Sequence, residues 1–190
     1  MLKNLFRPKR FERQLELQIA AHRPRLYRLA NSWCGDRMLA DDLVQETLKK
    51  ALLKQHQLKE FSRLEAWLCR ILHNCWMEYL RVKKPAMDID DVTLQHDQTP
   101  DKELTEQQVV ERVRHAIIML PLTQRQVITL VDLEGSSYEE VSEILEIPLG
   151  TVMSRLSRAR LLLKERLIGI QNIRSAHARS THQNHLRSVK

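Results

Sequence analysis

A chain of 190 residues with 43% hydrophobic content can bury the cores of one ordinary domain or two small ones, and 4 Gly and 6 Pro are too few for a turn-rich sheet protein. No apolar run approaches the ~20 residues that cross a bilayer, and three scattered cysteines without CxxC spacing exclude a disulfide framework or zinc ribbon. A net charge of +7 suits a polyanionic partner. We expect a soluble, cytoplasmic, all-α protein without metal or cofactor.

Charge is distributed unevenly along the chain. Residues 149–190 carry nine Arg or Lys against Glu165 alone, and their net charge of +8 exceeds the whole-chain total. Residues 86–104 have the opposite bias, with six acidic residues against Lys102 and a net charge of −5. The basic C-terminal part is therefore the candidate for contact with nucleic acid, and the acidic stretch is not.

Residues 1–85 are predicted to form a helical bundle, which Pro85 ends because the residue before a proline is pushed out of helical conformation. Apolar residues recur there at helical spacing, and Pro24 is expected in a first turn or at a kink. The stripes are Leu26, Leu29, Ala30 and Trp33; Leu43, Val44, Thr47, Leu48, Ala51 and Leu52; and Leu64, Trp67, Leu68, Ile71, Leu72, Cys75 and Tyr79. The polar, aperiodic residues 86–104 predict a flexible linker.

Residues 105–168 are predicted to form a second small helical domain. Three pairs in it have capping-box spacing, in which two side chains satisfy free backbone donors at a helix start. These pairs are Thr105 with Gln108, Thr123 with Gln126, and Ser137 with Glu140. The third pair precedes a short helix over 138–145, which a turn at 146–148 joins to a fourth helix beginning near Leu149.

The fourth helix of this domain has two distinct faces. Val152, Leu156 and Ala159 form an apolar stripe, and a second, polar face carries the candidate DNA contacts. These candidates are Gly150, Thr151, Met153, Ser154, Arg155, Ser157 and Arg158. A basic surface helix is usually only solvated, but a short capped helix, a tight turn and then a basic helix is the arrangement that docks in the major groove. The pattern predicts a DNA-binding helix-turn-helix.

Residues 120–167, LPLTQRQVITLVDLEGSSYEEVSEILEIPLGTVMSRLSRARLLLKERL, resemble region 4 of extracytoplasmic-function (ECF) sigma factors of bacterial RNA polymerase. The resemblance implies that Met153, Ser154, Ser157 and Arg158 face the minus-35 promoter element. Met153 departs from the family pattern, in which Lys or Arg is usual. Because methionine cannot donate a bidentate hydrogen bond to guanine but can pack against a thymine methyl, a different base preference is predicted.

The segment DDLVQETLKKAL resembles region 2 of the same sigma factors. Asp42, Gln45 and Glu46 lie at i, i+3 and i+4, so one helix face presents two carboxylates and an amide. Such a face is normally just solvated. The resemblance assigns it, with the adjacent Asp41, to the clamp coiled coil of the polymerase.

The segment LEAWLCRILHNCWMEYLRVKKP also resembles region 2, where a base of the minus-10 element leaves the stack and enters a protein pocket. The resemblance implies that the preceding loop and this helix hold the base. The candidates are Leu58, Phe61, Arg70, Ile71 and Asn74. The loop KEFSRLE lacks the glycine common in the family, and Ser62 with Glu65 has capping-box spacing instead.

The resemblance implies a sigma factor that binds core RNA polymerase through its clamp coiled coil and flap, reads promoter DNA, and is controlled by an anti-sigma factor. A stand-alone helix-turn-helix repressor or activator is the alternative. An enzyme is not expected, because no phosphate-binding loop or nucleophile and base pair stands out. Cys69 and His73 at i, i+4 are more simply a core cysteine beside a chance histidine. Residues 169–190, with His177, His182 and His185, are predicted to be a disordered basic tail.

Overall fold

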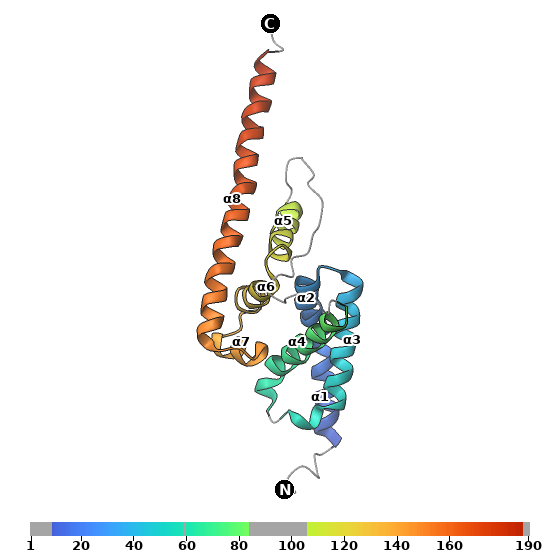
Figure 1. Ribbon diagram of the computed structural model, residues 1–190. Helices are drawn as coiled ribbons and strands as arrows, with labels where there is room; N and C mark the ends of the chain where they lie inside the picture. The colour runs from blue at the N-terminus through green and yellow to red at the C-terminus, as the bar shows by residue number, and fades with distance from the viewer. Residues whose placement is uncertain (1–8, 59, 84–105, 188–190) are drawn as a thin grey trace.

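The computed structural model describes the backbone of residues 9–58, 60–83 and 106–187 and the side chains of 13–58, 60–83 and 109–168. All regular structure in this part of the chain is helical, so the predicted all-α class is confirmed (Figure 1). The elements are α1 (Lys9–Ala21), α2 (Arg23–Cys34), α3 (Arg37–Leu53), η1 (Gln55–Gln57), η2 (Phe61–Arg63), α4 (Leu64–Lys83), α5 (Glu106–Ile118), α6 (Leu122–Ile128), η4 (Thr129–Leu133), α7 (Tyr138–Leu145) and α8 (Leu149–Arg187). The predicted linker lies outside the described residues.

Helices α1 to α4 form the N-terminal bundle. Its fully buried centre includes Trp33, Val44 and Leu72. Pro24 lies in the first turn of α2, which is one of the two positions predicted for it. Gly35 ends that helix at a φ of 70°, where its N–H donates to Asn31 O at 2.9 Å. This sharp turn brings α3 back against α2.

Two sequence predictions in the bundle are wrong. Leu52, expected on the inward stripe, is 41% exposed near the end of α3. The Ser62 and Glu65 capping box does not form, because the 3-10 turn η2 precedes α4 and the Ser62 hydroxyl lies 3.3 Å from a Glu60 carboxylate oxygen. The chain therefore enters α4 through a tight turn and not through a capped first residue.

The C-terminal half begins with α5 and ends with the long helix α8. Ser137 and Glu140 form the predicted capping box at the start of α7, with the Glu140 carboxylate accepting from Ser137 N at 2.8 Å. The Thr123 and Gln126 box is wrong, because α6 starts at Leu122 after a proline and the Gln126 side chain is buried. The Thr105 box lies outside the described residues.

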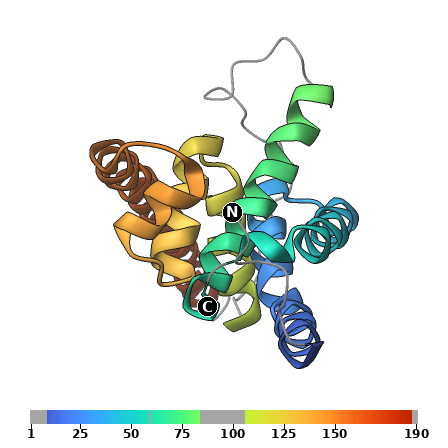
Figure 2. The same cartoon turned by 90° about the horizontal axis from the view of Figure 1, so that it is seen from below.

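The two halves pack against each other and share one hydrophobic core. Helix α7 lies along α4, and α2 contacts both α5 and α6 (Figure 2). The sequence predicted two helical domains and a linker but contained no signal that the domains would touch. The two halves meet where Trp33 of α2 and Thr129 of η4 are both buried, and the Trp33 indole N–H donates to the Thr129 hydroxyl.

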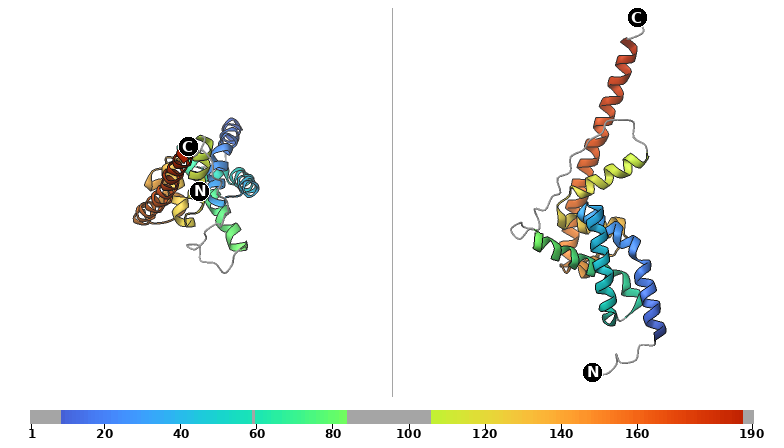
Figure 3. Two further views of the ribbon diagram at one scale, coloured as in Figure 1. Left: turned by 90° about the horizontal axis from the view of Figure 1, so that it is seen from above. Right: turned by 90° about the vertical axis from the view of Figure 1, so that its right-hand side faces the viewer.

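Helix α8 continues to Arg187 and projects beyond the other helices (Figure 3). The prediction of a disordered tail from residue 169 differs from this backbone. The physical reason is that no glycine or proline follows Gly169, so the segment holds no strong helix breaker. The side chains of the tail histidines lie outside the described residues.

Candidate nucleic-acid and polymerase interfaces

The start of α8 places its predicted DNA-contacting residues around one exposed surface. The opposite stripe is buried: Val152 and Ala159 are 0% exposed and Leu156 is 3% exposed. Gly150, Met153, Ser154, Ser157 and Arg158 are exposed, and Thr151 and Arg155 are half-buried. A helix fixed by its apolar stripe can present its other face without moving. We call these seven residues the α8 reading face.

The turn between α7 and α8 fixes the entry angle of the second helix. Glu146 takes a left-handed conformation at a φ of 56°, and Ser142 Oγ donates to Ile147 O at 2.6 Å. Pro148 O accepts from Thr151 N at 2.8 Å, which closes the first turn of α8. Gly150 is exposed and is the second residue of α8, in the first turn, where backbone amides lack acceptors within the helix and can bind a phosphate.

One arginine of α8 is held in an ion pair within the protein. Arg160 forms a bidentate contact with Asp132 of η4, with nitrogen to oxygen distances of 2.6 and 3.0 Å. The hydrogen bond that Arg160 donates to this carboxylate raises its pKa above the ordinary value. Arg160 therefore holds α8 against η4, whereas Arg158 is the exposed arginine of the reading face.

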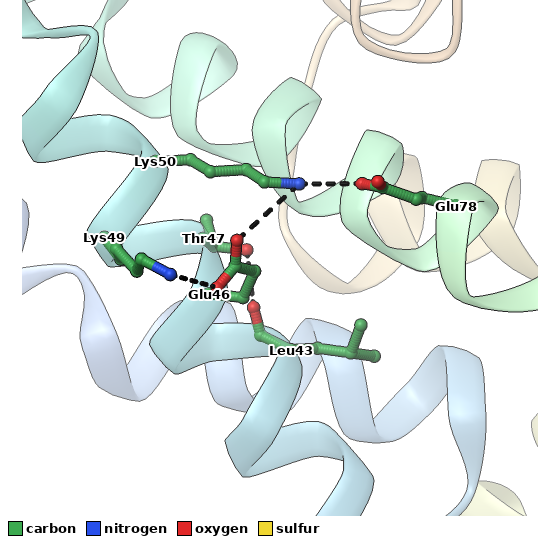
Figure 4. Close-up of polar contacts among 6 residues, drawn as sticks. All are labelled: Leu43, Glu46, Thr47, Lys49, Lys50 and Glu78. Atoms are coloured by element: carbon green, nitrogen blue, oxygen red, sulfur yellow. Dashed lines mark hydrogen bonds and ion pairs between the residues drawn. The ribbon is translucent and has the colours of Figure 1, made fainter.

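The four predicted polymerase-binding residues lie together on α3. Gln45 Nε2 donates to Asp41 Oδ2 at 2.9 Å, and Asp41 also pairs with Arg23 at 2.6 Å. Glu46 lies 3.4 Å from Lys49 and 3.8 Å from Lys50 (Figure 4). Asp42 is exposed and makes no ion pair within the described residues.

Helices α3 and α4 are joined beside this face by a further ion pair. Lys50 Nζ donates to Glu78 at 2.7 Å (Figure 4). The same hydrogen bond raises the pKa of Lys50 and lowers the pKa of Glu78. Because Lys50 also contacts Glu46, the ion pair between Lys50 and Glu78 helps to hold the Glu46 carboxylate in place.

Two exposed apolar residues of α3 lie in line with the predicted polymerase-binding residues, and the sequence analysis did not include them among the candidates. Met38 is 81% exposed and Leu52 is 41% exposed. Their positions share the helical register of Asp42, Gln45 and the exposed Lys49, and this periodicity was the signal that could have found them. Residues 38, 42, 45, 49 and 52 form one strip with apolar ends, which we call the α3 face.

The predicted minus-10 contacts on α4 and its preceding loop divide into two groups. Arg70 and Asn74 are exposed one helical turn apart. Leu58 is 2% exposed and Ile71 is 9% exposed, so both are core residues here. The bundle interior covers their apolar side chains in this structure, and their assignment as base contacts stays a prediction.

Phe61 is half-buried beside a cavity between α1 and the start of α4. The cavity has a volume of about 400 Å³ and is lined mainly by polar side chains. Its lining residues are Gln14, Gln18, His22, Phe61, Ser62, Leu64 and Glu65. The residues from α1 were absent from the sequence prediction because no local spacing connects them to the loop.

Where the halves meet, Cys69 is buried and His73 is half-buried. Burial raises the pKa of the Cys69 thiol to about 12 and lowers the pKa of His73 to about 4. His73 Nδ1 lies 3.0 Å from the Gln126 amide nitrogen, and its ring meets the Trp33 ring edge-on. The surroundings are those of packed core residues. Within the described ranges, no group of three or more His, Cys, Asp or Glu is placed to hold a metal ion.

Comparison with known proteins identifies the family to which the chain belongs. The family model for sigma-70 region 2 matches residues 18–85, and the model for sigma-70 region 4 matches residues 110–163. The ECF RNA polymerase sigma factor EcfG of Rhodopseudomonas palustris is 35% identical over 142 residues, which cover 75% of this chain and 78% of the relative. This chain belongs to the ECF sigma factor family. The ECF sigma factor SigM of Mycobacterium tuberculosis is 31% identical, covering 80% of this chain and 75% of the relative.

Two solved structures have the same helical architecture. The sigma factor RpoE of Bartonella quintana, in complex with the anti-sigma factor NepR, matches with a TM-score of 0.62 and 33% identity, covering 84% of this chain and 98% of that one. CnrH in complex with the cytosolic domain of CnrY matches in fold with a TM-score of 0.60 and 24% identity, covering 83% of this chain and 89% of that one. None of the described helices of this ECF sigma factor is long and apolar enough to span a membrane. The stand-alone repressor alternative does not account for the region 2 match.

Proposed function

We propose that this ECF sigma factor binds core RNA polymerase in the bacterial cytoplasm and directs it to promoters that the α8 reading face and the α4 helix recognise. The observation that carries the proposal is the α8 reading face, which is exposed on a helix whose opposite stripe is fully buried. The chain contributes binding and positioning, and the polymerase performs the chemistry. No catalytic residue of its own is required.

At the minus-35 element, Arg158 is the residue suited to pair with a guanine edge or a phosphate. Met153 is 52% exposed at the start of the helix, where recognition helices insert into the major groove. Its thioether supplies apolar contact instead of a hydrogen bond. The preferred sequence at that position therefore favours a thymine methyl.

At the minus-10 element, Arg70 and Asn74 offer a charge and an amide on one exposed face of α4. The cavity beside Phe61 is a candidate base pocket, because amide, hydroxyl and aromatic groups can bond and stack with an unpaired base. We leave Leu58 and Ile71 out of this surface because they are buried.

The polymerase contacts divide between the two halves of the chain. The α3 face offers Asp42 and Gln45 for polar contact with the clamp coiled coil, and Met38 as an apolar anchor. For the flap, the C-terminal half offers a cavity of about 370 Å³ between α6, η4 and α8 with mainly aliphatic walls. Its aliphatic lining residues are Ile128, Leu163, Leu167 and Ile168.

We further propose that an anti-sigma factor controls this chain. The proposal is supported by its likeness to the Bartonella quintana sigma factor, whose structure was solved in complex with an anti-sigma factor. The described part of the chain is occupied by the two sigma regions and holds no separate sensor domain. The inducing signal would then act on the partner.

The test is in vitro transcription of genomic promoters with core polymerase. We expect promoter-specific transcripts that Asp42→Ala with Gln45→Ala abolishes, because the clamp contact is lost. The matched control is Glu16→Ala, an exposed carboxylate on α1 outside the α3 face. A free chain that protects duplex DNA at nanomolar concentration without polymerase, and yields no transcript with it, would instead support the repressor alternative.

A further inference from the structure

The Asp41 carboxylate is held from two sides by other side chains of the N-terminal bundle. Its Oδ1 accepts from Arg23 Nη2 at 2.6 Å, and its Oδ2 accepts from Gln45 Nε2 at 2.9 Å. Arg23 is the first residue of α2, whereas Asp41 and Gln45 lie one turn apart on α3. Both carboxylate oxygens are therefore engaged within the protein, and the guanidinium balances the charge of Asp41.

The backbone around Arg23 gives this side chain a fixed starting point. Pro24 follows it in the first turn of α2, and a proline fixes its own φ and limits the conformations of the preceding residue. The helix is anchored in the core one turn later, because Leu26 is 1% exposed. Arg23 thus reaches Asp41 from a rigid helix start, although the two residues lie 18 positions apart in the sequence.

The contact with Asp41 determines which end of the Gln45 amide a partner can reach. An ionised carboxylate only accepts hydrogen bonds, so the NH2 group of the amide has to face it and the oxygen has to point elsewhere. Gln45 is exposed, so its Oε1 atom remains available as an acceptor. The exposed Asp42 adds a carboxylate beside it. This part of the α3 face therefore suits a surface that supplies donors, such as Arg or Lys side chains.

The neighbouring residues Asp41 and Asp42 differ in how their charges are used. Asp41 is half-buried and already paired with Arg23. Asp42 is exposed and makes no ion pair within the described residues. A partner cation has to compete with Arg23 for Asp41, whereas it can pair with Asp42 without breaking any contact of the chain.

Resting on the proposed function, we propose that Arg23 and Asp41 are positioning residues for polymerase binding. Arg23 holds the Asp41 carboxylate, and Asp41 orients Gln45 so that its Oε1 atom faces the polymerase. The family resemblance assigned Asp41 itself to the clamp coiled coil and did not include Arg23. In the arrangement proposed here, the conformational entropy of the long Gln45 side chain is lost on folding instead of on binding.

The orientation of Gln45 is tested first in the free full-length chain, by NMR of its side-chain NH2 group. Gln45→Ala assigns the signal by its disappearance, and we expect the chemical shift and slow solvent exchange of a hydrogen-bonded amide. Asp41→Ala should move both toward the values of a solvated glutamine, and Arg23→Met should move them in the same direction by less. Arg13→Met removes an exposed arginine of α1 and should leave them unchanged. An amide that is already solvated in the unchanged chain, or that Asp41→Ala does not affect, would overturn the proposal.

A double-mutant cycle on binding to core polymerase separates positioning from direct contact. A residue that acts only through Gln45 should lose its effect when Gln45 is replaced, whereas an independent contact should keep it. We expect Asp41→Ala to weaken binding by roughly 2- to 10-fold, the cost of ordering one long side chain, and to have no further effect beside Gln45→Ala. Asp42→Ala removes the neighbouring carboxylate and should weaken binding in both backgrounds. Equal losses from Asp41→Ala in both backgrounds would show that Asp41 contacts the polymerase itself, and the positioning role would be wrong.

Two controls separate this inference from misfolding and from the proposed function. The Arg23 and Asp41 side chains are 55% and 37% exposed, and exposed ion pairs contribute little to stability, so Arg23→Met should leave the melting temperature almost unchanged. If Asp42→Ala with Gln45→Ala abolishes binding but Asp41→Ala has no effect, the proposed function stands and the positioning role is wrong. If binding survives that double substitution, the proposed clamp contact fails, and the NMR result alone decides whether Arg23 and Asp41 orient Gln45.

Discussion

The two helices that carry the proposed DNA contacts differ in what their polar side chains already contact. On α8, Arg158 and Met153 are exposed. On α4, Arg70 is paired with Glu146 from the other half, and α7 lies along the helix. The proposed minus-35 surface is therefore exposed, whereas the proposed minus-10 surface is partly occupied by internal contacts. The candidate DNA contacts of α8 are thus exposed, whereas one of those on α4 is paired with another part of the chain.

The largest expected effect concerns the junction that occupies α4. Trp33→Ala removes a fully buried ring together with its hydrogen bond to Thr129, and we expect a loss of about 3 to 5 kcal/mol in the free energy of unfolding. Urea denaturation followed by circular dichroism measures it. Trp67→Ala, at a half-buried position of α4, should cost less. Two separate transitions in the unchanged chain would show that the halves fold independently.

The next effect is a dependence of stability on pH at the same junction. Burial holds the pKa of His73 near 4, below its ordinary value of 6.5. The unfolded chain therefore binds this proton first, so the stabilisation is complete above pH 6.5 and is lost as pH falls toward 4. We expect a loss of up to ~3 kcal/mol relative to His73→Gln, measured by urea unfolding at pH 7 and pH 4.5. Equal acid sensitivity of the two proteins would contradict the assignment.

A third experiment sharpens the comparison from the α8 side. Met153→Arg should change base preference at one minus-35 position by ~1 to 3 kcal/mol, toward guanine. Binding to a library of promoter sequences by the holoenzyme measures it. Leu161→Arg adds the same charge two turns further along α8 and should strengthen binding to all sequences alike. An unchanged preference would remove Met153 from the reading face.

The smallest effect belongs to the exposed ion pair between α4 and the turn before α8. The Arg70 and Glu146 side chains are 50% and 54% exposed, so Glu146→Lys should cost only ~0.2 to 1 kcal/mol of stability. Glu143→Lys is the matched control on α7, because that carboxylate lies 3.9 Å from Arg63 and should contribute less. Thermal unfolding of the three proteins, repeated at high salt, checks the order. A salt-independent difference would point to packing instead of charge.

Sequence periodicity was sufficient for the helices and for the buried stripe of α8. The stripe of Val152, Leu156 and Ala159 and the Ser137 cap are local patterns, and each is found as predicted. Ile71 is buried as its apolar stripe predicted, and Leu58 is buried too, whereas the base-contact role of both rests on family resemblance, which does not report burial. The contact of the buried Arg125 with Trp33 O could not have been found, because an arginine on a helix normally indicates solvent and Trp33 lies 92 residues away. Contacts between distant segments leave no local spacing.

The turn at Glu146 has a consequence for how α8 meets DNA. Only Ile147 and Pro148 separate Glu146 from the first residue of α8, and the left-handed backbone at Glu146 sets the direction in which that helix departs. Arg70 of α4 donates to the carboxylate of this same residue, so a side chain of the N-terminal half contacts the turn that orients α8. The two helices that carry the proposed promoter contacts are thus connected through a single turn residue.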